Sequence, residues 1–302
     1  MTKSMFRWSL SVGASVLLAG MASAQGIASN VAVPYYTPDH FVQGLYHEAL
    51  SPKAKNFNRQ AQSLQAAMQQ YCATTTAAAA EGLTVVRASW ANTAQAWDSL
   101  SAVSVGPVLK RRSQRQIDFS PTRPALIERA IQAAPANAKD MERVGTPAKG
   151  FPALEWLLWT QPTQPATPAC NFAVQVTAEL AREAAVLDKA FADDAGRDWA
   201  DEESAAAMSE VVNQWLGGLE RLRWAHIEKP LREAQSRSSG EAQSKSSTTT
   251  ARKGATPDFP RLAGNGTAAS WAAQWEAISA VAIARSAQIP EAGTALVPLE
   301  TY

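Results

Sequence analysis

The chain has 302 residues, with 28 Lys and Arg against 27 Asp and Glu, so its formal net charge is only +1. A balance this close to neutral argues against nucleic acid as a partner, because nucleic-acid binders usually carry a strong basic excess. The one concentrated basic run, at 110–115, is interpreted as a solvated loop. With only three histidines in the chain, few catalytic schemes that depend on imidazole are open.

Residues 1–24 have the pattern of a signal peptide. Two basic residues precede an apolar run at 8–18, and Ala22-Ser23-Ala24 forms an A-x-A cleavage site. We therefore expect export to the periplasm, cleavage after Ala24 and a soluble mature protein. No cysteine lies nearby to accept a lipid, so a lipoprotein is not expected. An uncleaved anchor is the alternative, although the apolar run is short for a bilayer and no later stretch approaches a membrane span.

Apolar residues recur at helical spacing through nearly the whole chain, which predicts an all-α fold. In the first half, helices are expected at 38–50, from Ser51-Pro52 to Cys72, at about 83–97, from 124 and from 152. Gly106-Pro107 and the glycines and prolines at 145–150 separate them. The helix from 152 must end before Pro162, because a proline cannot continue it.

The second half predicts longer helices. One runs from about 171 to 191, and another from 201 to about 229, where Pro230 is expected to stop it. The Ser- and Thr-rich insert at about 235–257 has scarcely an apolar residue, so disorder is expected there. A last helix follows Thr267, with Trp271 and Trp275 facing inward.

Cys72 and Cys170 are the only cysteines. In an oxidising compartment an even number of cysteines predicts one disulfide, although two buried thiols remain an alternative. The tryptophans on the helical stripes are interpreted as core residues rather than as a ligand platform.

The histidines do not form an evident metal site. His40 and His47 are seven residues apart on one helix, about 10 Å along its axis, which is too far to share a metal ion. His226 lies on an apolar stripe, which favours a hydrogen-bonded histidine in the core or at an interface. No H-E-x-x-H, G-x-S-x-G or P-loop motif is present.

Residues 149–159, Lys-Gly-Phe-Pro-Ala-Leu-Glu-Trp-Leu-Leu-Trp, carry the most specific pattern. This segment resembles the signature of the imelysin-like family, G-x-H-x-x-E followed by aromatic and leucine residues. Gly150 and Glu155 stand at their expected positions, and Pro152 replaces the histidine. The segments 88–97, 106–107 and 115–121 and Cys170 agree as well, so the similarity spans most of residues 35–290.

The resemblance implies two helical-bundle lobes related by a rough duplication, with the motif near the groove between them. The predicted organisation is a signal peptide at 1–24, an N-terminal helical lobe at 25–160 that ends in the motif, and a C-terminal helical lobe at 161–302. The proline-rich segment 161–168 is the candidate boundary, and the insert lies within the second lobe.

The family motif places a histidine and a glutamate three residues apart on one face of a helix, where both can bind a cation. Pro152 has no lone pair to offer a metal ion. Glu155 therefore remains as a tentative lone metal ligand, with iron as the possible cofactor, or as one partner of a structural ion pair. Oxygen-rich binding of ferric iron would need further Asp or Glu side chains.

The family is associated with bacterial iron uptake, and some members are described as peptidases. We expect a non-catalytic periplasmic binding or accessory protein whose groove recognises iron, an iron-bearing ligand or a membrane protein partner. One alternative is a metallopeptidase of the imelysin type that uses ligands outside the motif. The other is a structural interaction module, which a dry and filled groove would favour.

Overall fold

The computed structural model describes residues 37–74, 78–244, 255–283 and 298–301. Every regular element in these ranges is helical, which confirms the predicted all-α class. No helix within these ranges has the length and apolarity that crossing a bilayer requires. The predicted signal peptide, residues 1–24, lies outside them.

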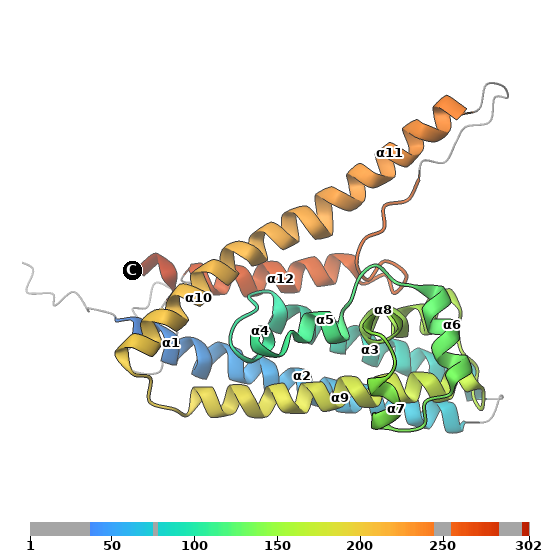
Figure 1. Ribbon diagram of the computed structural model, residues 1–302, viewed down its shortest axis with the longest axis horizontal. Coiled ribbons are helices and arrows are strands. Elements are labelled where there is room, and N and C mark those ends of the chain that lie inside the picture. Colours follow the sequence, from blue (N-terminus) through green and yellow to red (C-terminus); the bar gives the residue numbers. More distant parts are fainter. Residues whose placement is uncertain (1–36, 75–77, 245–254, 284–297, 302) are drawn as a thin grey trace, which may run out of the picture. The chain divides into compact units, whose positions relative to one another are not determined.

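Figure 1 shows the order of the elements along the chain. In order they are α1 (Pro38–Gly44), η1 (Leu45–Leu50), α2 (Ser51–Ala73), α3 (Ala79–Ser101), α4 (Pro107–Arg111), α5 (Ser113–Ile117), α6 (Pro124–Ala133), α7 (Ala138–Glu142), η3 (Thr146–Ala148), α8 (Gly150–Glu155), η4 (Trp156–Thr160), α9 (Pro168–Ala195), α10 (Asp201–Glu220), η5 (Arg221–Glu228), α11 (Lys229–Ser244), α12 (Thr267–Ala282) and η6 (Leu299–Thr301).

The long helices pack in two groups that share α3. Helix α2 lies between α9 and α3, with α8 resting on α9, whereas α12 packs against α3 and α10, and α10 packs against α1. The described residues belong to one compact unit, and the α2–α9 pair joins the two sides of the boundary predicted near residue 160. The position of that boundary stays a prediction.

The core is formed by the apolar helix faces that the sequence pattern predicts. On α2, Phe57, Leu64 and Met68 are fully buried, and on α3 the same holds for Trp90 and Trp97. These side chains recur four or seven residues apart, which is one or two helical turns, so those of each helix face one direction and exclude water together.

One predicted core residue is exposed. Trp275 on α12 has 56% of its surface exposed, so the expectation that it faces inward is wrong. The buried face of α12 passes instead through Ala273, Ala277 and Val281, which recur four residues apart. Trp271 is only partly buried and packs against the core.

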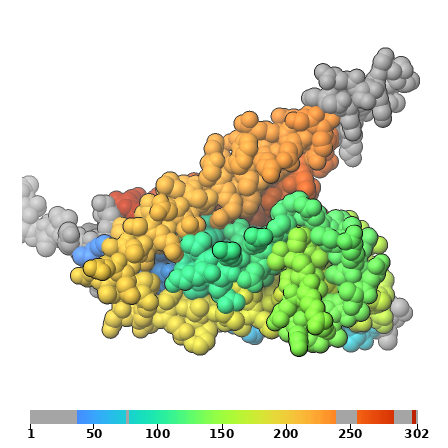
Figure 2. Space-filling view, viewed as in Figure 1, coloured from blue at the N-terminus to red at the C-terminus, as the bar shows by residue number. Residues whose placement is uncertain are grey.

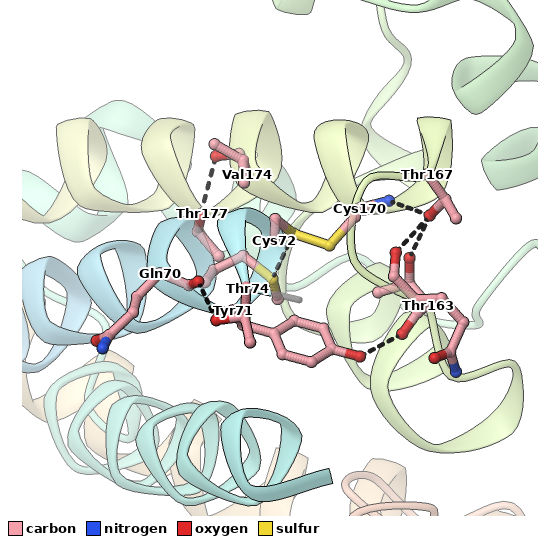
Figure 3. Close-up of a disulfide and its surroundings, with 11 residues drawn as sticks. Gln70, Tyr71, Cys72, Thr74, Thr163, Thr167, Cys170, Val174 and Thr177 are labelled. Atoms are coloured by element: carbon pink, nitrogen blue, oxygen red, sulfur yellow. Dashed lines mark hydrogen bonds between the residues drawn. A yellow bond between two sulfur atoms is a disulfide. The ribbon is translucent and has the colours of Figure 1, made fainter. Parts of the chain in front are cut away.

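Cys72 and Cys170 form the predicted disulfide (Figure 3). The bond joins the C-terminal end of α2 to the first turn of α9 and closes a separation of 98 residues. Neighbouring hydrogen bonds fix the same junction: the Tyr71 hydroxyl donates to the Thr163 carbonyl at 2.6 Å, and Thr167 Oγ1 accepts from the Cys170 amide at 3.2 Å.

Three π-helical segments, η1, η4 and η5, each end two residues before a proline. A proline lacks the N–H that would bond to the carbonyl four residues earlier, and its ring clashes with that carbonyl. A widened turn moves this carbonyl away from the ring. The chain therefore remains helical through Pro52 and Pro230. The prediction that a helix starts at Ser51-Pro52 is confirmed, because α2 begins at Ser51 directly after η1. The prediction that Pro230 stops a helix is wrong, because α11 runs from Lys229 to Ser244. After η4 the helix ends before Pro162, as predicted.

The predicted disorder of 235–257 is also wrong in part, because residues 235–244 belong to α11. The hydroxyls of Ser236 and Ser238 bond back to carbonyls four residues earlier, so these serines remain compatible with a helix. The Arg237 guanidinium also donates to the Thr256 carbonyl at 3.2 Å. Figure 2 shows α11 extending beyond the body formed by the other helices. Residues 245–254 lie outside the described ranges.

Reducing the disulfide should destabilise the fold without changing its helical content under native conditions. Cross-linking residues 98 apart removes unfolded-state entropy worth about 4–5 kcal/mol in the chain-entropy account. We expect Cys72→Ser/Cys170→Ser to lower the free energy of unfolding by about 2–5 kcal/mol, measured by urea denaturation followed by circular dichroism. A loss below about 0.5 kcal/mol would contradict a structural role for the bond.

Candidate functional site

A pocket of about 330 Å³ lies beside the motif segment 149–159. Its walls come from three parts of the chain: the stretch after α5, the helix formed by α8 and η4, and the loop that precedes α12. The residues that line it are Asp118, Ser120, Thr122, Pro124, Pro152, Glu155, Trp156, Thr160, Asp258, Phe259, Pro260, Arg261, Leu262 and Ala263.

Gly150 lets α8 begin directly beneath the end of α5. Its φ of +76° lies in the region that favours glycine, and a Cβ at this position would lie 2.1 Å from the carbonyl oxygen of Ile117. The first motif residue therefore has a steric role, because any side chain would push α8 away from the segment that carries Asp118.

Pro152 and Glu155 line the same pocket, as expected for residues three apart on a helix. Glu155 Oε1 accepts a hydrogen bond from the main-chain amide of Gly264 at 2.9 Å. Burial raises the pKa of the Glu155 carboxyl above its usual value, and only part of this effect is offset by the amide of Gly264 and the charge of Arg261.

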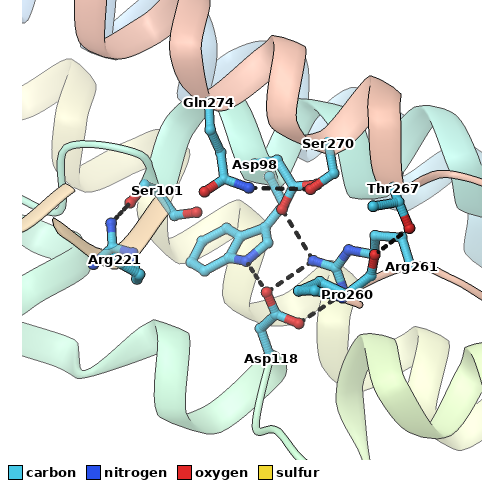
Figure 4. A network of polar contacts seen from close by, with 10 residues as sticks. Asp98, Ser101, Asp118, Arg221, Pro260, Arg261, Thr267, Ser270 and Gln274 are labelled. Carbon is cyan, nitrogen blue, oxygen red and sulfur yellow. Dashed lines mark hydrogen bonds and ion pairs between the residues drawn. The ribbon is translucent and has the colours of Figure 1, made fainter. Parts of the chain in front are cut away.

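Arg261 is the central charge of the site (Figure 4). Its guanidinium is 5% exposed and donates to both oxygens of Asp118 at 2.8 Å and to Asp98 Oδ1 at 3.1 Å. Trp97 Nε1 donates to Asp118 Oδ2 at 3.0 Å. One arginine thus ties together α3, the segment after α5 and the loop before α12.

A second arginine and a histidine lie behind this cluster. Arg221 donates to the carbonyls of Ser101 and Ala102, both at 2.8 Å, at the C-terminal end of α3, where the helix dipole favours a cation. Within the described ranges, Nδ1 of His226 is buried without a hydrogen-bond partner, so the predicted hydrogen bond is not found at this atom. Burial, reinforced by the charge of Arg221, lowers the pKa of His226.

The residues at the pocket do not fit a metal ion. Glu155 already accepts from Gly264, both oxygens of Asp118 accept from Arg261, and Pro152 offers no lone pair. In the described part of the chain, no group of three or more His, Cys, Asp and Glu side chains is placed to hold a metal ion. The tentative assignment of Glu155 as a metal ligand therefore finds no co-ligands among these residues.

The other two histidines serve local contacts. Nδ1 of His40 lies 2.9 Å from the hydroxyl of Thr37 and forms part of the capping box of α1. Nδ1 of His47 lies 2.8 Å from Glu48 in an exposed pair. Neither residue lines the pocket.

The motif segment 149–159 contains three of the residues that line the pocket, Pro152, Glu155 and Trp156, whereas Asp98 and Arg261 carried no sequence signal. Asp118 lies in the matching stretch 115–121, but no local pattern gives it a role. Asp98 and Arg261 are 163 residues apart, and Arg261 follows an insert without helical periodicity. Only the tertiary structure brings these two side chains together.

Removing the buried arginine should be strongly destabilising. Arg261→Met would leave Asp98 and Asp118 without their counter-charge, at a cost of about 3–5 kcal/mol in the free energy of unfolding. Urea denaturation at pH 7 would measure the loss. Arg129→Met, on the exposed face of α6, is the control and should change stability by less than about 0.5 kcal/mol. Adding Asp98→Asn to Arg261→Met should recover part of the loss, and a double variant no better than the single one would contradict this account.

His226 should make the protein less stable as the pH falls below about 6.5, the ordinary histidine pKa. Because burial lowers the pKa of His226 in the folded protein, the unfolded chain takes up the proton first as the pH falls. The free energy of unfolding therefore declines between the unfolded-state pKa and the lower folded-state pKa. The contribution is at most about 1.4 kcal/mol per pH unit. Urea midpoints between pH 7.5 and 5 should fall less steeply in His226→Gln, and parallel slopes would contradict this prediction.

The chain resembles known proteins in both sequence and fold. The family model described as imelysin, peptidase M75, matches residues 50–253. No curated protein matches the chain. Among solved structures, the chain is similar to an imelysin-like protein from Psychrobacter arcticus 273-4, with 20% sequence identity and a TM-score of 0.63 over 83% of this chain and 76% of that one. At this level of identity the likeness shows the shared fold.

Proposed function

Because this chain belongs to the imelysin family, we propose that it is a non-catalytic binding or accessory protein of the periplasm with a role in iron uptake. The signal-peptide pattern at 1–24 supports the compartment. The family resemblance supports the link to iron. The proposed ligand is an iron-bearing molecule rather than a bare ion, because the pocket lacks a metal ligand set.

The observation that carries the proposal is the open pocket at the motif. A purely structural module predicts a filled groove, yet about 330 Å³ remains beside Glu155 and Trp156. This volume is at the lower end of the range for small-molecule sites. A desolvated carboxylate and a partly apolar wall give such a ligand both a polar and an apolar surface to contact.

The charges of the pocket favour a neutral or positively charged ligand. Asp118, Glu155 and Asp258 line it, and the one cation among its described lining residues, Arg261, is held by Asp98 and Asp118. An anionic iron complex would bring further negative charge towards carboxylates and would find no uncommitted arginine or lysine in this lining.

Calorimetric titration with two ferric complexes tests the proposal. The complex of desferrioxamine B carries a free ammonium group, whereas ferric citrate is an anion. We expect the mature protein to bind the cationic complex and to discriminate against citrate by about tenfold or more, because one favourable or unfavourable charge contact contributes about 1 kcal/mol or more.

Charge reversal at the rim provides the matched control. Asp258→Lys should weaken binding of the cationic complex by about tenfold, whereas Asp193→Lys, exposed on α9 away from the pocket, should not change it. Binding of neither complex would favour the structural module. Chelator-sensitive cleavage of a peptide substrate would instead support the metallopeptidase alternative.

A further inference from the structure

The loop at 255–266 forms one whole wall of the pocket. It supplies six consecutive lining residues, 258–263, and its turns are closed by main-chain bonds such as Gly266 N to Arg261 O at 2.9 Å. Arg261 and Asn265 both adopt left-handed backbone conformations, with φ of 62° and 53°. Such conformations are unfavourable for residues with a side chain, so contacts from outside the loop must hold this shape.

Two external anchors are present. The first is the guanidinium of Arg261, held by Asp98 and Asp118. The second is Glu155, whose carboxylate accepts a hydrogen bond from the amide of Gly264, three residues after Arg261. The anchors act on residues three apart, one through a side chain and one through the main chain.

The second anchor depends on a close approach of the backbone. A Cβ on Gly264 would lie 2.9 Å from the Trp90 ring and 3.5 Å from the Trp159 ring. The loop therefore lies directly on these two tryptophans, and this contact brings its amide within reach of the last residue of α8. Trp90 and Trp159 pack edge to face beneath it, with ring centres 4.9 Å apart.

We infer that Glu155 is a positioning residue that anchors the loop 255–266 through the Gly264 amide and so shapes the wall of the pocket, in place of the cation-binding role that the family motif implies. Pro152 agrees with this role, because it lines the same pocket, is buried and has no lone pair with which to form a metal site beside the carboxylate. The inference holds whatever ligand the pocket takes.

Hydrogen exchange of the Gly264 amide tests the anchor directly in the mature protein. Glu155→Ala should accelerate exchange by about tenfold or more, because a hydrogen bond to a charged group is lost. Glu155→Gln keeps an acceptor oxygen and should restore most of the protection. Glu128→Ala, on the exposed face of α6, is the control and should leave the exchange unchanged. Unchanged protection of Gly264 in Glu155→Ala would overturn the inference.

The pH dependence of this amide exchange provides a second test, because a loss of packing alone would not make the protection of Gly264 depend on pH. Protection of Gly264, relative to core amides, should fall as the pH drops through the Glu155 pKa, which burial raises above its usual value. It should stay level in Glu155→Gln, which does not titrate. Equal pH dependence in the two proteins would contradict the role of the carboxylate.

The variant Pro152→His recreates the family motif and tests the second half of the inference. Titration with Zn²⁺ and with Fe²⁺ should show no stoichiometric binding, because the Gly264 amide engages Oε1 of Glu155 and the described residues offer no set of further ligands. Stoichiometric binding with Gly264 still protected would overturn the inference. These experiments measure metal binding and amide exchange. They can therefore fail or succeed independently of the titration with ferric complexes that tests the proposed function.

Discussion

The structure around the pocket depends on how one buried positive charge is neutralised. Arg261 is almost fully removed from water, and an unpaired charge in that position would cost several kcal/mol. Asp98 and Asp118 are its counter-charges, and they come from α3 and from the segment after α5. Satisfying this charge therefore fixes the loop before α12 against both parts of the chain. The pocket forms where these elements meet.

The motif segment of this chain combines a steric role with a polar one. Gly150 permits the close approach of α8 to Ile117, and Glu155 lines the pocket. With proline at position 152, the carboxylate serves a main-chain amide. The family relationship over residues 50–253 thus indicates where to look for a site, but not what the site binds. The ligand has to be inferred from the hydrogen-bonding groups and charges of the individual residues.

Local patterns in the sequence were enough to predict the helical class, the disulfide and the position of the motif, because each depends on spacing or on residue type. They were not enough at Pro230, where the π-helical segment η5 relieves a clash that would otherwise end the helix. Nor did they reveal Arg261, whose partners Asp118 and Asp98 lie 143 and 163 residues away. The missed features are those that long-range contacts decide.

The π-helical segments also determine how changes in chain length act on this protein. A helix turns by about 100° for every residue, so the loss of one residue within η5 would leave α11 helical but rotate it relative to α10. Arg237 would then turn away from the carbonyl of Thr256, which it now reaches at 3.2 Å. A deletion of one residue at this point would therefore redirect α11 rather than shorten it.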